Sequence, residues 1–118
     1  MTHEQAIRAY TTIISMGRRA KGKAAFALFH LKGRLKEVID FQAEKEMELI
    51  KKYDGELRDG GLVFIEDKEK RKQFLEEKNE IGKMEIEPEI TPVRINPELI
   101  PDINIEEIEA LSGFVNFE

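Results

Sequence analysis

The chain contains no cysteine and no tryptophan among its 118 residues. The absence of cysteine excludes disulfides, a thiol nucleophile and thiolate zinc sites, and it fits a reducing compartment such as the cytoplasm. Long apolar runs are also missing near the start, where Ile13 and Ile14 form a block far too short for a signal peptide or a membrane span. We therefore expect a cytoplasmic protein that does not enter a membrane.

Charged residues are abundant, at 36% of the chain, and they are unevenly placed. Residues 1–36 hold eight basic side chains and one acidic one, a net charge of +7, so the remainder carries −12 of the total of −5. This asymmetry fits a basic nucleic-acid face with an acidic tail. It equally fits two halves, or two protomers placed head to tail, that neutralise each other. We favour the second interpretation.

Residues 22–53 predict one long amphipathic helix, ended by Asp54 and Gly55. At 1.5 Å per residue this helix is about 45–50 Å long, more than the diameter expected of a compact domain of this size. Part of it should therefore project or pack against a partner chain. Its predicted apolar stripe repeats at steps of three or four and consists of Leu28, Leu31, Leu35, Ile39, Ala43, Met47, Ile50 and Tyr53.

A shorter helix precedes it, with Thr2 and Gln5 in capping-box spacing. Gly17 and Gly22 bracket a basic turn and predict a helical hairpin with unequal arms. One continuous helix through the turn is the alternative. The short helix and residues 22–53 thus form a predicted hairpin over residues 1–53.

Residues 54–118 predict a small α+β part, so that the chain is a single α+β domain. Expected elements are a buried strand at Leu62–Ile65, a helix from Lys68 to Ile81 ended by Gly82, a half-buried strand at Met84–Glu87, an extended segment past Pro97 and Pro101, a helix at Ile105–Leu111 capped by Asn104 and Glu107, and a docked apolar end at Phe114–Phe117.

No catalytic or metal motif stands out, and we expect no enzyme activity, no metal and no cofactor. His3 should be solvated, whereas His30 should have a structural role on the long helix, which supplies it with no second ligand. The alternating Glu85, Glu87 and Glu89 lack EF-hand spacing and indicate a solvated acidic face. Residues 17–23 match GxxxxGK by accident, since Ala24 replaces the required Ser or Thr and no strand precedes them.

The basic turn is the only cluster that resembles a site. The candidate partner-binding residues are Arg18, Arg19, Lys21, Lys23, Phe26 and Phe29. Basic side chains interleaved with aromatic ones are typical of a nucleic-acid groove, and Lys32, Arg34 and Lys36 continue the positive charge. The alternative, which we favour, is that the phenylalanines belong to the core and the charges are solvated.

A long helix ending in LIKKYD is followed along the chain by DGGLVFIED, FLEEKNEIGKMEIEPEI and IEEIEALSGFVNF. This order of features resembles a family of small uncharacterised proteins, a domain of unknown function, encoded by tailed phages and prophages of Gram-positive bacteria. The resemblance covers most of residues 22–118, and the basic turn at 18–23 and the prolines depart from it.

The resemblance carries over no catalytic residue. It implies a non-enzymatic phage or prophage protein that acts by protein–protein contact, as a virion accessory or assembly factor, in the host cytoplasm or attached to the virion. The over-long helix predicts a homo-oligomer, most simply a symmetric dimer, and other phage structural proteins are candidate partners. The alternative is a nucleic-acid-binding or host-regulatory phage protein that uses the turn at residues 18–23.

Overall fold

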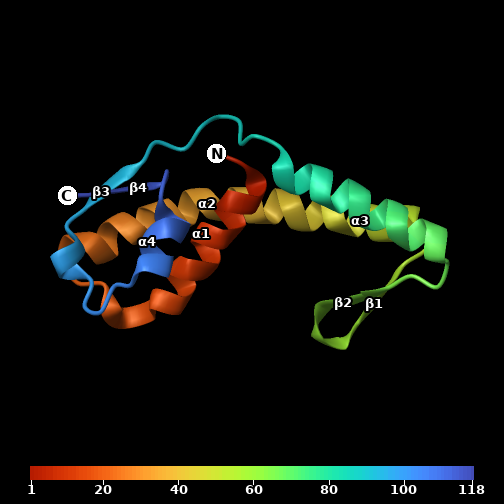
Figure 1. The fold of residues 1–118 in the computed structure, drawn as a ribbon, viewed down its shortest axis with the longest axis horizontal. Helices are drawn as coiled ribbons and strands as arrows, with labels where there is room; N and C mark the ends of the chain where they lie inside the picture. The colour runs from red at the N-terminus through yellow and green to blue at the C-terminus, as the bar shows by residue number, and fades with distance from the viewer.

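The computed structural model describes all of residues 1–118, and its fold belongs to the predicted α+β class. Helix α1 (His3–Met16) and helix α2 (Gly22–Lys52) lie side by side as the predicted helical hairpin (Figure 1). Helix α2 is 31 residues long and follows the long axis of a molecule that measures 51 × 29 × 22 Å. The other elements are grouped near one or the other of its two ends (Figure 1).

Local signals define the hairpin. The Thr2 hydroxyl accepts a hydrogen bond from the Gln5 N–H, and the Gln5 side chain accepts one from the Thr2 N–H, which confirms the capping box. Gly17 opens a 3₁₀ turn, η1 (Gly17–Arg19), and has a φ of 53°, while Gly22 has a φ of 52°. Residues other than glycine rarely adopt a positive φ of this size, because their Cβ atom is then crowded by the backbone. The chain therefore reverses here, and the alternative of one continuous helix is wrong.

The buried stripe of α2 matches the prediction in the first half of the helix and departs from it in the second. Ile39 is half-buried, while Ala43 and Met47 face solvent. Each step of four residues turns about 40° beyond a full helical turn, so three such steps in succession leave the original face. The residues of α2 that are buried are Ala24, Leu28, Leu31, Leu35, Val38, Gln42, Leu49 and Ile50.

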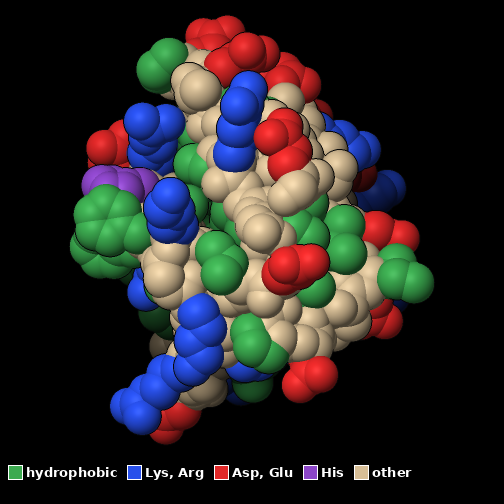
Figure 2. Space-filling view, turned by 90° about the vertical axis from the view of Figure 1, so that its left-hand side faces the viewer, with side chains coloured by type: hydrophobic (Ala, Val, Ile, Leu, Met, Phe, Trp, Pro, Cys, Tyr) green, Lys and Arg blue, Asp and Glu red, His purple; other side chains and the backbone are tan.

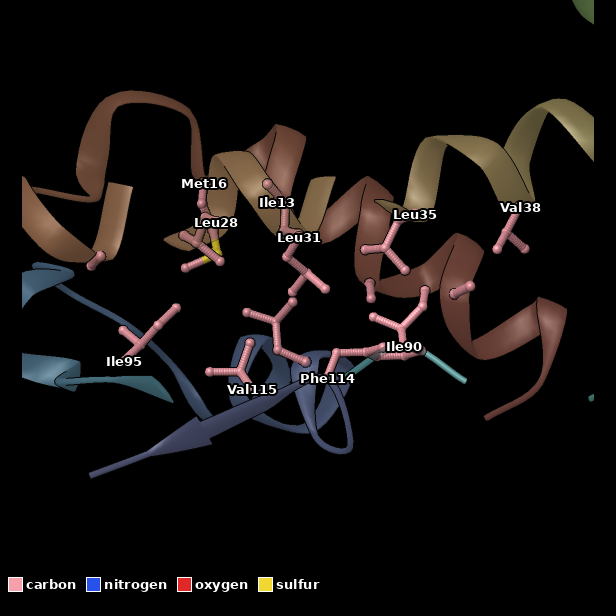
Figure 3. Packing of buried hydrophobic residues seen from close by; sticks show 14 of the residues in the cluster. Ile13, Met16, Leu28, Leu31, Leu35, Val38, Ile90, Ile95, Phe114 and Val115 are labelled. Atoms are coloured by element: carbon pink, nitrogen blue, oxygen red, sulfur yellow. The ribbon is translucent and has the colours of Figure 1, made fainter. Parts of the chain in front are cut away.

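The main hydrophobic core lies where the first half of α2 meets α1 and the end of the chain. Figure 3 shows Leu28, Leu31 and Leu35 of α2 pointing toward Phe114 and its neighbours. The core contains 16 buried residues, and Leu31, Leu35 and Phe114 are at most 1% exposed. The end of the chain is therefore docked, as predicted.

Three elements hold this docked end. Strand β3 (Val93–Ile95) pairs in parallel with β4 (Val115–Phe117), and helix α4 (Ile105–Leu111) connects them across α1. Helix α4 has the predicted bounds. Its capping box is confirmed, because the Asn104 side chain accepts from the Glu107 N–H at 2.9 Å and the Glu107 carboxylate accepts from the Asn104 N–H at 3.1 Å.

A smaller cluster covers the other end of α2. Helix α3 (Lys68–Lys83) packs along α2, and the hairpin of β1 (Glu56–Arg58) and β2 (Leu62–Phe64) projects beside it, with its tip at the 3₁₀ turn η2 (Asp59–Gly61) (Figure 1). Asp67 caps α3 as predicted, but the helix runs through Gly82. The cluster consists of five buried residues: Leu49, Ile50, Tyr53, Ile65 and Phe74.

Three predictions between residues 62 and 101 are wrong. Leu62–Ile65 is not a buried strand, because only Ile65 is buried and Leu62 is 68% exposed on the hairpin. Met84–Glu87 forms no strand, only one bridge between Thr2 and Glu85. Pro97 begins a 3₁₀ turn, η3 (Pro97–Leu99), since proline fits the first helical position, and the segment is not extended there.

Candidate interaction surface

The structure divides the predicted partner-binding residues between two environments. Arg19 turns inward, and its guanidinium donates to both carboxylate oxygens of Glu107, at 2.8 and 2.9 Å. It also donates to the backbone oxygens of Pro101 and Asp102, at 3.1 and 2.7 Å. Because these contacts use all three nitrogens of the guanidinium, Arg19 holds α4 against the turn between α1 and α2.

This contact changes the acidity of both groups. The hydrogen bond to the Arg19 guanidinium lowers the pKa of Glu107, against the opposing effect of burial. The same hydrogen bond raises the pKa of Arg19. Both groups are therefore held in their charged forms, and the pair is part of the scaffold.

The other three basic residues of the turn, Arg18, Lys21 and Lys23, are exposed. None of them takes part in an ion pair within the chain. Lys21 also fixes the turn through its N–H, which donates to the Leu99 oxygen at 2.8 Å. Lys23 lies one turn before Phe26 on α2, so positive charge borders the aromatic residues.

Phe26 and Phe29 are 67% and 70% exposed, so the interpretation that they belong to the core is wrong. His30 lies beside both, in edge-to-face contacts. The centre of its ring is 4.8 Å from the centre of the Phe26 ring and 5.9 Å from the centre of the Phe29 ring. We call Phe26, Phe29 and His30 the aromatic cluster. Figure 2 views the end of the molecule where α2 begins and shows hydrophobic side chains beside a histidine, with lysine and arginine around them.

The aromatic cluster points away from the core for a geometric reason. Leu28, Leu31 and Leu35 define the buried side of α2, and at about 100° per residue Phe26 and His30 lie nearly opposite to them. Sequence reasoning selected the phenylalanines but not His30. The helical phase relative to the leucines is the signal that would have placed all three outside.

A second apolar surface lies on the projecting hairpin. Leu62 and Phe64 lie on one face of it and are 68% and 40% exposed, and the Arg58 guanidinium lies 3.9 Å from the centre of the Phe64 ring. Leu57 pairs with Val63, lies on the opposite face and is 52% exposed. Both strands of this two-stranded hairpin are edges that offer backbone groups for pairing. Because Leu62–Ile65 was predicted to be a buried strand, the sequence analysis did not predict this exposed apolar surface.

A groove of about 720 Å³ runs between the middle of α2 and residues 84–91. The prediction that His3 is solvated is wrong, because it is 93% buried at this groove, with its ring 5.2 Å from that of Phe41. The His3 N–H of the backbone donates to the Met84 oxygen, which holds the first turn of α1 against the groove wall. Glu85, Glu87 and Glu89 line the groove, but no three His, Cys, Asp or Glu side chains lie close enough together to bind a metal ion.

Comparison with known proteins adds no relative. No family model, no curated protein and no solved structure matches the chain. None of the helices combines the length and the apolar character that crossing a membrane requires.

Proposed function

We propose that this protein has no catalytic role and works by contact with other protein chains, as an accessory or assembly factor of a tailed phage or prophage of Gram-positive bacteria. The phage origin rests on the resemblance of residues 22–118 alone. The contact role rests on one observation, the aromatic cluster presented to solvent on α2. A rigid helix that displays phenylalanines away from its own core provides anchors of the kind that partner proteins bury.

Burying such phenylalanines against a partner would contribute a large part of the binding free energy. A phenylalanine buries about 150–250 Å² in a good interface, worth roughly 25 cal/mol per Å² of apolar surface removed from water. Phe26 and Phe29 keep about two thirds of their surface exposed in the single chain. The apolar hairpin supplies a second surface, and its free strand edges suit a partner that adds a strand.

Co-purification tests this proposal. The chain is expressed with the products of the genes that flank its own, and we expect one of those products to stay bound. Replacing Leu62 and Phe64, or Phe26 and Phe29, by serine should release the partner. Ile105→Ser is the matched control, because Ile105 is 73% exposed but lies on α4, away from both surfaces. A chain that is strictly monomeric and retains none of these products would contradict the proposal.

A second candidate is nucleic-acid binding, which the exposure of Phe26 and Phe29 beside Lys23 favours. Bases stack on exposed aromatic rings while basic side chains contact the phosphates. Binding of a single-stranded oligonucleotide to the unchanged chain should then weaken as the salt concentration rises, and the triple change of Arg18, Lys21 and Lys23 to glutamate should abolish it. Arg19 is left unchanged, because its loss would disturb the contact with Glu107. No retardation of the oligonucleotide at low salt would exclude this candidate.

A further inference from the structure

A second stripe runs along α2 on the side away from the core, and every one of its members is exposed. Its steps alternate between four and three residues, the spacing by which one helix packs along another. We call it the outer stripe of α2. It consists of Gly22, Phe26, Phe29, Gly33, Lys36, Asp40, Ala43 and Met47.

Gly33 in this stripe has no role inside the chain. A side chain placed there would meet nothing within 4 Å, and its φ is not in the left-handed region. Glycine inside a helix lowers its stability, so the chain itself gives no reason to have one here. Close approach of another backbone does give a reason, because two helices packed through glycine come nearer than side chains permit.

Charge along α2 changes sign at its midpoint. Residues 22–36 contain four basic side chains and no acidic one, whereas Glu37, Asp40 and Glu44 follow on the exposed face. None of these basic or acidic side chains takes part in an ion pair within the chain. The exposed face of α2 is therefore complementary to itself when a second copy runs in the opposite direction, and repulsive when it runs in the same direction.

The apolar residues fit the same arrangement. A twofold axis that crosses α2 between Lys36 and Glu37 sets Phe26 and Phe29 of one copy against Met47 and Ala43 of the other. Large side chains thus face a flexible methionine and a small alanine, which suits interdigitated packing. Gly33 then lies opposite Asp40, and Lys36 lies within reach of the other copy's acidic residues.

We infer that the outer stripe of α2 is the interface of an antiparallel, twofold-symmetric dimer of this chain. This inference rests on the proposed function, since it names the first partner of the aromatic cluster as a second copy. The projecting hairpin, at the far end of the molecule, is left open to other proteins. Such an isologous contact closes on itself and does not propagate into a filament.

Sedimentation analysis of the full chain tests the inference. At micromolar concentration the wild type should be a dimer. The change of Phe26 and Phe29 to serine should raise the dissociation constant at least about a hundredfold, because each anchor occurs twice. Ile105→Ser, which removes an equally exposed apolar side chain elsewhere, should leave it unchanged. A monomeric wild type would overturn the inference, as would a dimer that survives the loss of both phenylalanines.

Charge exchange tests the orientation. Lys36→Glu and Asp40→Lys should each weaken the dimer about tenfold or more, and an equimolar mixture of the two should restore it as a heterodimer. In a parallel dimer neither single change would weaken association, because like charges would already face each other, and that result would overturn the antiparallel arrangement.

A monomeric chain that still binds the product of a flanking gene would refute the dimer and leave the proposed function intact. A monomeric chain whose oligonucleotide binding needs Phe26 and Phe29 would refute both.

Discussion

At the scale of single residues, Glu107 links parts of the chain that are distant in sequence. Its carboxylate accepts from Arg19 in the turn between α1 and α2, and one of its oxygens also accepts from the Asn104 N–H. One buried side chain thus completes a helix cap and joins α4 to the helical hairpin. The cap follows from local sequence spacing, whereas the ion pair depends on how the chain folds back over more than eighty residues.

Replacing Glu107 by glutamine should lower the midpoint of thermal unfolding at neutral pH by a few degrees, because the ion pair is lost. The folded state lowers the pKa of Glu107 below its ordinary value of 4.5. A depressed pKa contributes stability above the unfolded value, and this contribution disappears as the pH falls through the folded value. The difference between wild type and variant should therefore shrink below pH 4.5.

Glu106→Gln is the matched control, since Glu106 is an exposed neighbour that forms no ion pair. Its unfolding midpoint should differ little from that of the wild type across the same pH range. Equal destabilisation by both changes, or a Glu107 effect that grows in acid, would contradict the role assigned to the pair.

At the scale of elements, α2 carries an inner stripe, which is buried in the core of the single chain, and the outer stripe, which faces away from that core. The first half of the inner stripe and both capping boxes were predictable, because the signals are local and lie within a few turns. The second half of the inner stripe was not predictable from local signals. Leu49, for example, is buried by Ile65 and Phe74, and the positions of those two residues depend on where α3 packs. The same limit explains His3, which is buried because Phe41 of α2 lies beside it.

The candidate surface was only partly predictable for a related reason. Composition marked the turn and the two phenylalanines, but it could not decide that Arg19 turns inward while Phe26 turns outward. The inward direction of Arg19 depends on the position of α4, which supplies Glu107 and which the sequence alone does not give. The outward direction of Phe26 follows from its helical phase relative to the leucines, a signal that composition does not contain. The hairpin surface was missed because an apolar run such as Leu62–Phe64 resembles a buried strand.

Gly33→Ala separates the two uses of α2. In a chain that already carries serine at positions 26 and 29, which isolates the single protomer, alanine should raise the free energy of unfolding by about 0.5–1 kcal/mol. In the otherwise wild-type chain the same change should weaken the dimer, because the added methyl group keeps the helices apart. Denaturant unfolding and sedimentation measure the two effects. A stabilised protomer with an unchanged dimer would show that the helices do not approach at Gly33.

At the scale of the whole molecule, the two ends of α2 are stabilised unequally. The end near α1 and α4 has a core of 16 buried residues, and the end near α3 has five. Free energies of local opening follow the amount of buried apolar contact. Amide hydrogens of α3 and the β1–β2 hairpin should therefore exchange before those in the first half of α2. Simultaneous exchange at both ends would show instead that the chain opens as one unit.

The loss of unfolding free energy on removing an aromatic ring should also depend on whether that ring lies in the larger core or on the projecting hairpin. Phe114→Ala removes a ring that is 1% exposed in the larger core and should cost about 3–5 kcal/mol of unfolding free energy. Phe64→Ala, on the projecting hairpin, should change stability by less than about 0.5 kcal/mol. Chemical denaturation of both variants checks this, and a large loss from Phe64→Ala would mean that the hairpin belongs to the core.

The mass of the chain in solution, with and without Phe26 and Phe29, decides whether the outer stripe of α2 joins two copies. We expect a particle of twice 13.7 kDa for the wild type, and of 13.7 kDa once both residues are serine, with helix content unchanged by circular dichroism. A wild type that sediments at 13.7 kDa at every micromolar concentration would contradict that expectation.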